Sequence, residues 1–130
     1  MATRRIALAG ALTVAMAGTA VLGFPGAALA GWDASVGNSG GYGYFYSNGD
    51  RWSACDRVAD GYRVVVWADW KGRDGTSYSD TAVDADGANG NCHVNNAHNM
   101  PEGAKVLITL CLQDGAKGVP FDCKQTEGTA

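Results

Sequence analysis

The chain has 130 residues, of which 46% are hydrophobic, and it carries a net charge of −3 and four cysteines. This length allows one small domain with its own core. An acidic chain without a cluster of Lys and Arg repels phosphate backbones, so the composition argues against nucleic acid as a partner.

The first 30 residues have the organisation of a secretory signal peptide. Arg4 and Arg5 precede an apolar run over residues 6–24, and Ala28-Leu29-Ala30 provides a small-x-small cleavage pattern. The apolar run approaches the length of a membrane span, but its glycines and alanines and the cleavage pattern favour removal after Ala30. The arginine pair permits either the general secretory or the twin-arginine route. We therefore expect a secreted, extracellular protein with no membrane anchor after cleavage.

The mature chain, residues 31–130, would have 100 residues and a net charge of −5, because Arg4 and Arg5 are the only charged residues removed. Its first segment is rich in Gly, Ser and Asn, which predicts a flexible arm over residues 31–41. Downstream, apolar residues do not recur at helical spacing. Short alternating runs with Gly- and Asp-rich breaks predict a single all-β domain over residues 42–124, followed by a polar tail over 125–130.

Seven short antiparallel strands in about 100 residues fit a small β-sandwich of the immunoglobulin or fibronectin type. A small closed barrel is the alternative. The predicted strands lie near residues 42–46, 51–58, 62–70, 76–83, 92–98, 105–113 and 119–124.

The first two predicted strands form the clearest hairpin in the chain. Asn48-Gly49 can supply the two positive φ values of a type I′ turn. If these are the loop residues, the two residue numbers of each cross-strand pair add up to 97. One face of the hairpin then holds Phe45, Trp52 and Ala54 and is expected to join the core. The other, partly solvated face holds Tyr42, Tyr44, Tyr46, Arg51, Ser53 and Cys55.

The stretch from Tyr62 to Trp70 is the strongest strand. Its alternation places Tyr62, Val64, Val66, Ala68 and Trp70 on one apolar face, and Arg63, Val65, Trp67 and Asp69 on the other. Three successive valines favour a pleated strand over a helix. We expect the apolar face to meet Phe45, Trp52, Ile108 and Leu110 across the core.

All four cysteines lie in the mature chain, and an even count in a small exported protein predicts two disulfides. A zinc site of four thiolates is the alternative, but no Cys-x-x-Cys pair is present. Pairing Cys55 with Cys111, and hence Cys92 with Cys123, would give a disulfide between the two sheets, as in immunoglobulin domains. Alternation turns both Cys55 and Cys111 away from the core, which favours the pairs Cys55–Cys92 and Cys111–Cys123.

The sequence shows no pattern typical of a cofactor site, a metal site or a catalytic site. We therefore expect a protein without a cofactor or a metal ion. His93 and His98 fall on opposite faces of a strand. The polar loop over residues 84–91 lacks the glycine and glutamate positions of an EF-hand, which favours a solvated turn. A Ser–His–Asp assembly would leave no trace in the sequence, but no Gly-x-Ser-x-Gly elbow or spaced carboxylate pair supports an enzyme.

The tyrosines of the first hairpin are the most suggestive candidate site. Outward aromatic side chains on a rigid sheet offer a large contact area at a small entropy cost, and binding modules use them to hold sugar rings or partner side chains. The structural alternative is that tyrosine is simply a good strand former. The candidate ligand-binding residues are Tyr42, Tyr44, Tyr46, Arg51 and Trp67.

Two segments carry a resemblance, Ala54-Cys55-Asp56-x-x-x-Asp60-Gly61 and the stretch from Pro101-Glu102-Gly103 to Leu110-Cys111-Leu112. In these the chain resembles small secreted proteins of actinobacteria that have a two-disulfide β-domain and no assigned activity. The resemblance implies an all-β fold and an extracellular location, and no functional residues. The size and cysteine count are also similar to those of streptomycete α-amylase inhibitors, whose Trp-Arg-Tyr motif has its nearest match here in Asp50-Arg51-Trp52.

We therefore expect a non-enzymatic binding module whose partner is a glycan or an extracellular protein. The second hypothesis is an inhibitor of a secreted amylase or protease, acting through a protruding turn at residues 47–50 or 71–75. A small hydrolase is the third hypothesis. Oligomeric state leaves no mark on the sequence.

Overall fold

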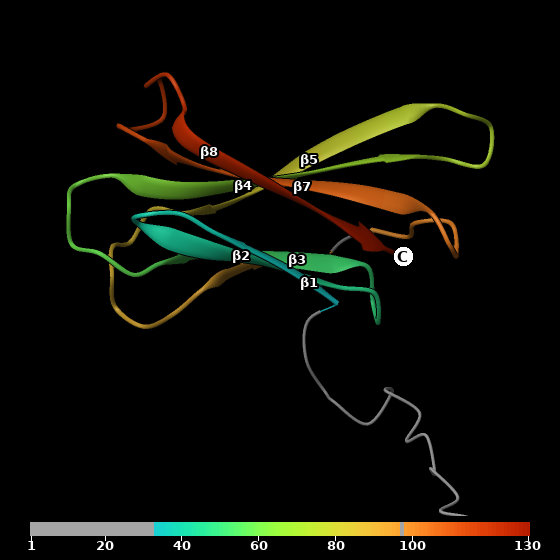
Figure 1. Cartoon of the computed structure of the whole chain (residues 1–130), viewed down its shortest axis with the longest axis horizontal. Helices are drawn as coiled ribbons and strands as arrows, with labels where there is room; N and C mark the ends of the chain where they lie inside the picture. Colours follow the sequence, from blue (N-terminus) through green and yellow to red (C-terminus); the bar gives the residue numbers. More distant parts are fainter. Residues whose placement is uncertain (1–32, 97) are drawn as a thin grey trace, which may run out of the picture.

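The computed structural model describes residues 33–96 and 98–130, so the predicted signal peptide lies outside the described residues. The described chain is an all-β sandwich of two four-stranded antiparallel sheets (Figure 1). Sheet A has the strand order β1-β2-β3-β6, and sheet B has the order β5-β4-β7-β8. The strands are β1 (Ala34–Gly37), β2 (Gly41–Tyr46), β3 (Arg51–Asp56), β4 (Arg63–Lys71), β5 (Ser77–Asp84), β6 (His93–Asn95), β7 (Lys105–Gln113) and β8 (Phe121–Thr129).

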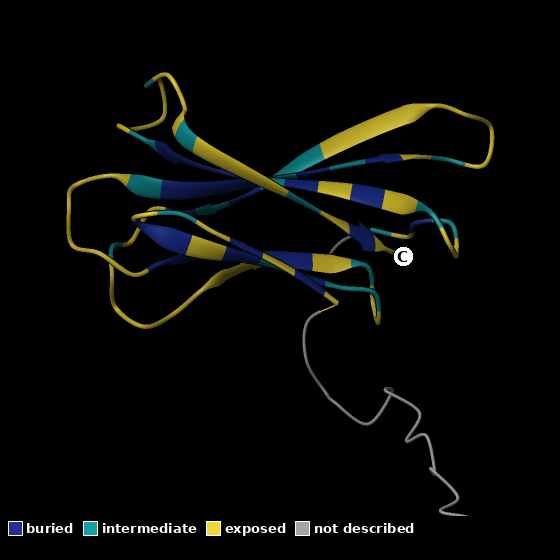
Figure 2. Cartoon of the chain, in the orientation of Figure 1, coloured by how far each residue is buried: buried dark blue, intermediate teal, exposed yellow. Residues whose placement is uncertain are grey.

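The predicted fold class is confirmed, and so is the core. Buried residues occur along the strands of both sheets, as the dark bands in Figure 2 show, and together they form one hydrophobic cluster. Val64, Val66 and Ala68 of β4 are fully buried, in one cluster with the expected partners from the other strands. Tyr62 departs from the expected pattern, because it lies just before β4 and is 39% exposed. The expected partners in the cluster are Phe45, Trp52, Ile108 and Leu110, and Trp70 of β4 belongs to the same cluster.

Two glycines on the inner side of β2 let the sheets approach closely. A Cβ at Gly41 would overlap the carbonyl oxygen of Cys55 and lie 2.6 Å from Val64 Cγ2. A Cβ at Gly43 would lie 3.0 Å from Val66 Cγ2. The bulk of the two valines in sheet B therefore fills the space that these positions of sheet A leave empty.

The hairpin of β2 and β3 has the predicted register, with Phe45 opposite Trp52 and Tyr46 opposite Arg51. The turn type differs from the prediction. Positive φ values occur at Gly49 (92°) and Asp50 (47°), one residue later than expected, so the connection is a four-residue loop rather than a two-residue type I′ turn. Asp50 tolerates this conformation, and its carboxylate accepts a hydrogen bond from the Met100 backbone N–H at 2.8 Å.

The expected flexible arm over residues 31–41 is wrong from residue 34 onward, because Ala34–Gly37 forms strand β1 along β2. Ala34 and Val36 are buried, and the Asn38 side chain accepts hydrogen bonds from the N–H groups of Gly40 and Gly41. The expected C-terminal tail over 125–130 is also wrong. Strand β8 continues to Thr129 along β7, and its Gly128 is buried against Phe45.

The structure pairs Cys55 with Cys92 and Cys111 with Cys123, as alternation predicted. Each bridge continues a ladder by one place, since Ala54 pairs with His93 and Leu110 pairs with Lys124. Both bridges therefore join neighbouring strands within one sheet, and their cysteines do not belong to the hydrophobic cluster between the sheets.

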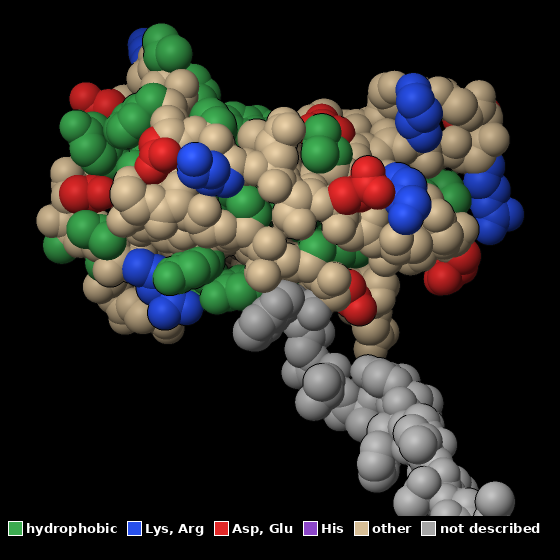
Figure 3. All heavy atoms as spheres, viewed as in Figure 1, with side chains coloured by type: hydrophobic (Ala, Val, Ile, Leu, Met, Phe, Trp, Pro, Cys, Tyr) green, Lys and Arg blue, Asp and Glu red, His purple; other side chains and the backbone are tan. Residues whose placement is uncertain are grey.

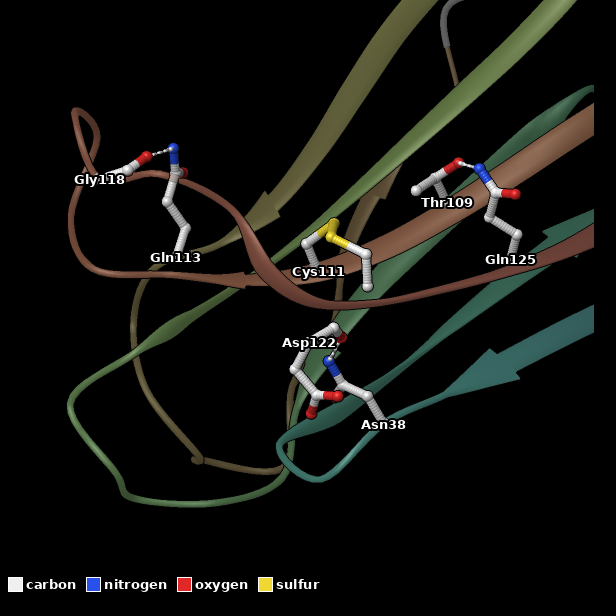
Figure 4. The surroundings of a disulfide bond; sticks show 8 residues. Asn38, Thr109, Cys111, Gln113, Gly118, Asp122 and Gln125 are labelled. Carbon is white, nitrogen blue, oxygen red and sulfur yellow. Dashed lines mark hydrogen bonds between the residues drawn. A yellow bond between two sulfur atoms is a disulfide. The ribbon is translucent and has the colours of Figure 1, made fainter.

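A β-bulge follows the second bridge. Asp122 has a φ of 49°, and the β7–β8 register shifts by one residue between Leu110 and Leu112. The carbonyl oxygen of Asp122 accepts a hydrogen bond from Asn38 Nδ2 at 2.8 Å, just beside the Cys111 disulfide (Figure 4). The Asp122 carboxylate also accepts the hydroxyl hydrogen of Ser39 at 2.6 Å. The bulge thus ties the β1–β2 turn of sheet A to sheet B.

We predict that Gly41→Ala destabilises the fold by about 1–3 kcal/mol, because the added methyl group overpacks the space between β2 and β4. Urea denaturation of the oxidised protein measures the loss. Gly37→Ala is the matched control, since Gly37 is exposed and the methyl group would meet the Tyr42 side chain at 2.9 Å but no backbone atom closer than 3.6 Å. An equal loss in both variants would contradict the close approach at Gly41.

Removing either disulfide should lower the free energy of unfolding, and by a different amount for each. Each replacement should cost about 2–4 kcal/mol, and the chain-entropy relation makes the loss about 1 kcal/mol larger for the bridge that spans more chain. The sequence separations are 37 for Cys55–Cys92 and 12 for Cys111–Cys123, and each pair has one buried cysteine. Urea denaturation of Cys55→Ala/Cys92→Ala and Cys111→Ala/Cys123→Ala tests this order. A larger loss for the second variant would refute it.

Candidate functional site

The outer side of sheet A carries an aromatic surface, which we call the tyrosine face: Tyr42, Tyr44, Tyr46, Arg51 and Arg57. The rings of Tyr42 and Tyr44 are nearly parallel, with 6.3 Å between centroids and 12° between planes. The Arg51 guanidinium lies over the Tyr46 ring at 4.9 Å, and that of Arg57 lies over the Tyr42 ring at 5.1 Å. Cation–π contacts at both ends therefore hold the row of rings in place.

The residues beside the rings are small or polar. Tyr42 is 43% exposed and its ring lies over Gly37 of β1. Ser53 of β3 pairs with Tyr44 and is only 2% exposed. The Ser53 hydroxyl is buried without a hydrogen-bond partner among the described residues, which is unusual for a polar group. The face therefore presents aromatic rings and guanidinium groups, while the Ser53 hydroxyl is buried.

Trp67 does not join the tyrosine face. It lies in β4, where it pairs with Thr81 and Thr109 in sheet B. Its neighbours Val66 and Ala68 point into the core, so Trp67 points away from sheet A. The structure thus brings together four of the five predicted ligand-binding residues and adds Arg57.

A second aromatic group, which we call the Trp70 cluster, lies at one end of the sandwich: Trp52, Trp70, Tyr78 and His98. Trp70 stacks on Tyr78, its cross-strand partner, with 5.7 Å between centroids and 16° between planes. His98 lies 4.8 Å from Trp52 and 5.2 Å from Trp70, between ring centroids. The buried Trp52 thereby connects the core to a surface group.

Polar contacts fix the His98 imidazole. Its Nε2 lies 2.8 Å from Asp80 Oδ2 and 3.1 Å from Asn95 Oδ1. The pKa of Asp80 lies below its usual range, chiefly because its carboxylate accepts a hydrogen bond from the Thr81 backbone N–H, with smaller contributions from Asn95 and His98. These contacts set the orientation of the imidazole ring next to both tryptophans.

Two buried carboxyl groups lie at strand ends, Asp56 at the end of β3 and Asp84 at the end of β5, where the polar loop over residues 84–91 begins. The backbone N–H of Asp56 donates to Asp84 Oδ2 at 2.8 Å, and both side chains are almost fully buried. Burial raises the pKa of Asp84, and a hydrogen bond with Asp86 adds to this effect. Burial also raises the pKa of Asp56. Within residues 33–96 and 98–130, no group of three or more His, Cys, Asp or Glu side chains could hold a metal ion.

An exposed apolar group lies at the opposite end, around the β7–β8 connection. Tyr62 contacts Phe121 edge to face, with 4.9 Å between ring centroids, and Val119 is 84% exposed. Figure 3 shows hydrophobic side chains gathered at this end of the molecule. Tyr62 is therefore a surface tyrosine that does not belong to the tyrosine face, with an exposure of 39% close to that of Tyr42.

Sequence reasoning missed three residues of these sites. Arg57 has the same parity as Cys55, so alternation along β3 could have placed it beside Tyr42. Tyr78 could have been found by pairing the two strands around the turn at residues 71–75, which puts it opposite Trp70. His98 lies outside the strands, and no pattern in the sequence indicates that it meets Trp52.

Comparison with known protein families, curated proteins and solved structures found no match. The functional argument therefore stands on the chemistry and geometry of the chain itself. The described segments contain no helix that is long and apolar enough to cross a membrane. Two disulfides in a small all-β fold are compatible with an extracellular protein.

The buried Asp84 predicts a specific pH dependence. Because burial raises the pKa of Asp84, the native chain holds its proton more tightly than the unfolded chain does. Its contribution to stability is complete below the ordinary value of 3.8 and is lost as the pH rises through the raised value. Asp84→Asn cannot ionise, so its unfolding free energy should increase relative to wild type as the pH rises above 3.8.

Urea denaturation across this pH range tests the effect. Asp114→Asn is the control, since Asp114 is an exposed carboxylate in the β7–β8 connection. A difference between Asp84→Asn and wild type that does not change with pH would show that Asp84 makes no such contribution.

Proposed function

We propose that this chain is a secreted, non-enzymatic binding module that holds a glycan on its tyrosine face. The observation that carries the proposal is the row of three tyrosines on the outer side of sheet A, with two parallel rings and an arginine at each end. Aromatic rings contact the C–H face of a sugar ring, while hydroxyl and guanidinium groups hydrogen-bond to its hydroxyls.

The arrangement of the face supports a glycan over a protein partner. Protein interfaces have a contiguous apolar centre surrounded by a polar rim. Here small, exposed residues stand beside the tyrosine rings, at Ser35 and Gly37. This alternation matches a sugar chain, in which apolar ring faces and hydroxyl groups also alternate.

The rigidity of the face also supports binding. The tyrosines stand on a central strand of sheet A, hydrogen-bonded to β1 on one side and to β3 on the other. The Cys55–Cys92 bridge holds β3 to the segment that leads into β6. A surface that is ordered before binding loses little conformational entropy when the ligand arrives.

Retention on insoluble polysaccharide tests the function. The mature, oxidised protein should be retained on at least one of cellulose, chitin and purified cell-wall sacculi. Tyr42→Ala should weaken retention by about threefold to tenfold, because one ring–sugar contact is lost, and Tyr44→Ala/Tyr46→Ala should weaken it further.

Tyr62→Ala is the matched control, because it removes a tyrosine of similar exposure outside the tyrosine face and should leave retention unchanged. Equal losses for Tyr42→Ala and Tyr62→Ala, or no retention on any of the three supports, would overturn the proposal. Failure of retention together with near-stoichiometric inhibition of a secreted amylase or protease would favour the inhibitor hypothesis instead.

A further inference from the structure

The Trp70 cluster borders an open hollow of about 720 Å³ at the end of the β4–β5 hairpin. In Figure 1 this hairpin extends beyond the neighbouring strands of sheet B, on the side where the β6–β7 connection also lies. The hollow is lined from both segments, and its size falls within the usual range for small-ligand sites. Its lining includes Trp70, Tyr78, Arg73, Asp74, His98 and Asn99.

The aromatic wall of the hollow is rigid. Trp70 is only 8% exposed and packs against the fully buried Trp52, with 6.0 Å between ring centroids. Tyr78 stacks on Trp70 and is 46% exposed. The same two rings line a second hollow of about 650 Å³ beside the first. A large, exposed ring held against a buried one is a ready contact surface for a flat apolar group.

The polar groups of the hollow are also held in place. The contacts of His98 with Asp80 and Asn95 orient its ring. The Asp74 carboxylate accepts a hydrogen bond from the Thr76 backbone N–H at 3.0 Å, which fixes the turn that bears Arg73. Planar guanidinium, carboxylate and amide groups can bond to two neighbouring hydroxyls at once.

The balance of charge narrows the class of ligand. Arg73 and Asp74 are adjacent in the chain and both line the hollow, so their opposite charges favour neither an anion nor a cation. A purely apolar ligand would displace water from the polar groups of the lining without replacing its hydrogen bonds, which is costly. A neutral ring with one apolar face and several hydroxyls satisfies both parts of the lining.

We propose that this hollow is a second carbohydrate site, which takes one pyranose ring of a neutral, soluble oligosaccharide against Tyr78. The site is independent of the tyrosine face, because its residues come from the β4–β5 hairpin and residues 98–101. The two proposals are therefore tested independently, and failure of one leaves the other unaffected.

Titration of the mature, oxidised protein with cellotriose, chitotriose and maltotriose tests the proposal, with calorimetry for affinity and amide NMR shifts for location. At least one of these sugars should bind and shift the amide signals of residues 70–78 and 98–100. Tyr78→Ala should lower the affinity about tenfold or more, whereas Tyr78→Phe keeps the ring and should stay within about twofold of wild type.

Tyr62→Ala is the control, because Tyr62 is an exposed tyrosine outside both the tyrosine face and the hollow, and it should bind these soluble sugars as wild type does. Arg73→Ala is a second variant outside the strands, so it tests the site even if Tyr78→Ala fails to fold, and it should weaken binding at least threefold. Absence of binding by all three sugars up to about 10 mM, or binding weakened by Tyr42→Ala and by neither hollow variant, would overturn the proposal.

Discussion

The burial of Trp52 between the two sheets is the contact on which the rest of the structure depends. Its side chain is fully buried, and its Nε1–H donates to the carbonyl oxygen of Val66 in the opposite sheet at 3.3 Å. An indole in the core needs a partner for this N–H group, because an unpaired buried donor is costly. The hydrogen bond therefore sets where β3 lies relative to β4 as well as how close they are.

Both candidate surfaces follow from that placement. Arg51, the residue before Trp52, points to the outer side of sheet A, where it covers Tyr46. On the inner side the Trp52 ring contacts Trp70 and His98 and so connects the core to the hollow. One strand, with alternate side chains on opposite faces, thus supports a flat aromatic surface and one wall of a concave one.

Much of the fold could be predicted because the alternation in β2, β3, β4 and β7 is strong. The same alternation predicted the disulfide pairs, since it turned Cys55 and Cys111 away from the core. Strand β1 and the end of β8 were missed because their inner positions are small or polar, as at Ala34, Thr126 and Gly128. Two of these residues lie beside Phe45: Ala34 is its cross-strand partner, and its ring leaves no room for a side chain at Gly128.

The candidate surfaces were predicted in part, for a related reason. The tyrosine face lies on one hairpin, so local register was enough to assemble most of it. Trp67 was assigned to the wrong surface. Alternation shows on which side of its own sheet a residue lies, but it does not show which sides of the two sheets pack together. The Trp70 cluster joins residues from β3, β4, β5 and the segment after β6, and only the packed sandwich brings them together.

The position of the disulfides has a consequence for a chain under mechanical tension. Cys55–Cys92 closes a covalent ring that contains the whole β4–β5 hairpin, and Cys111–Cys123 closes another around the β7–β8 connection. A force applied to the two chain ends would pass through the sulfur atoms and bypass both rings. The central strand, with its three valines, could not be drawn out lengthwise even if both sheets separated.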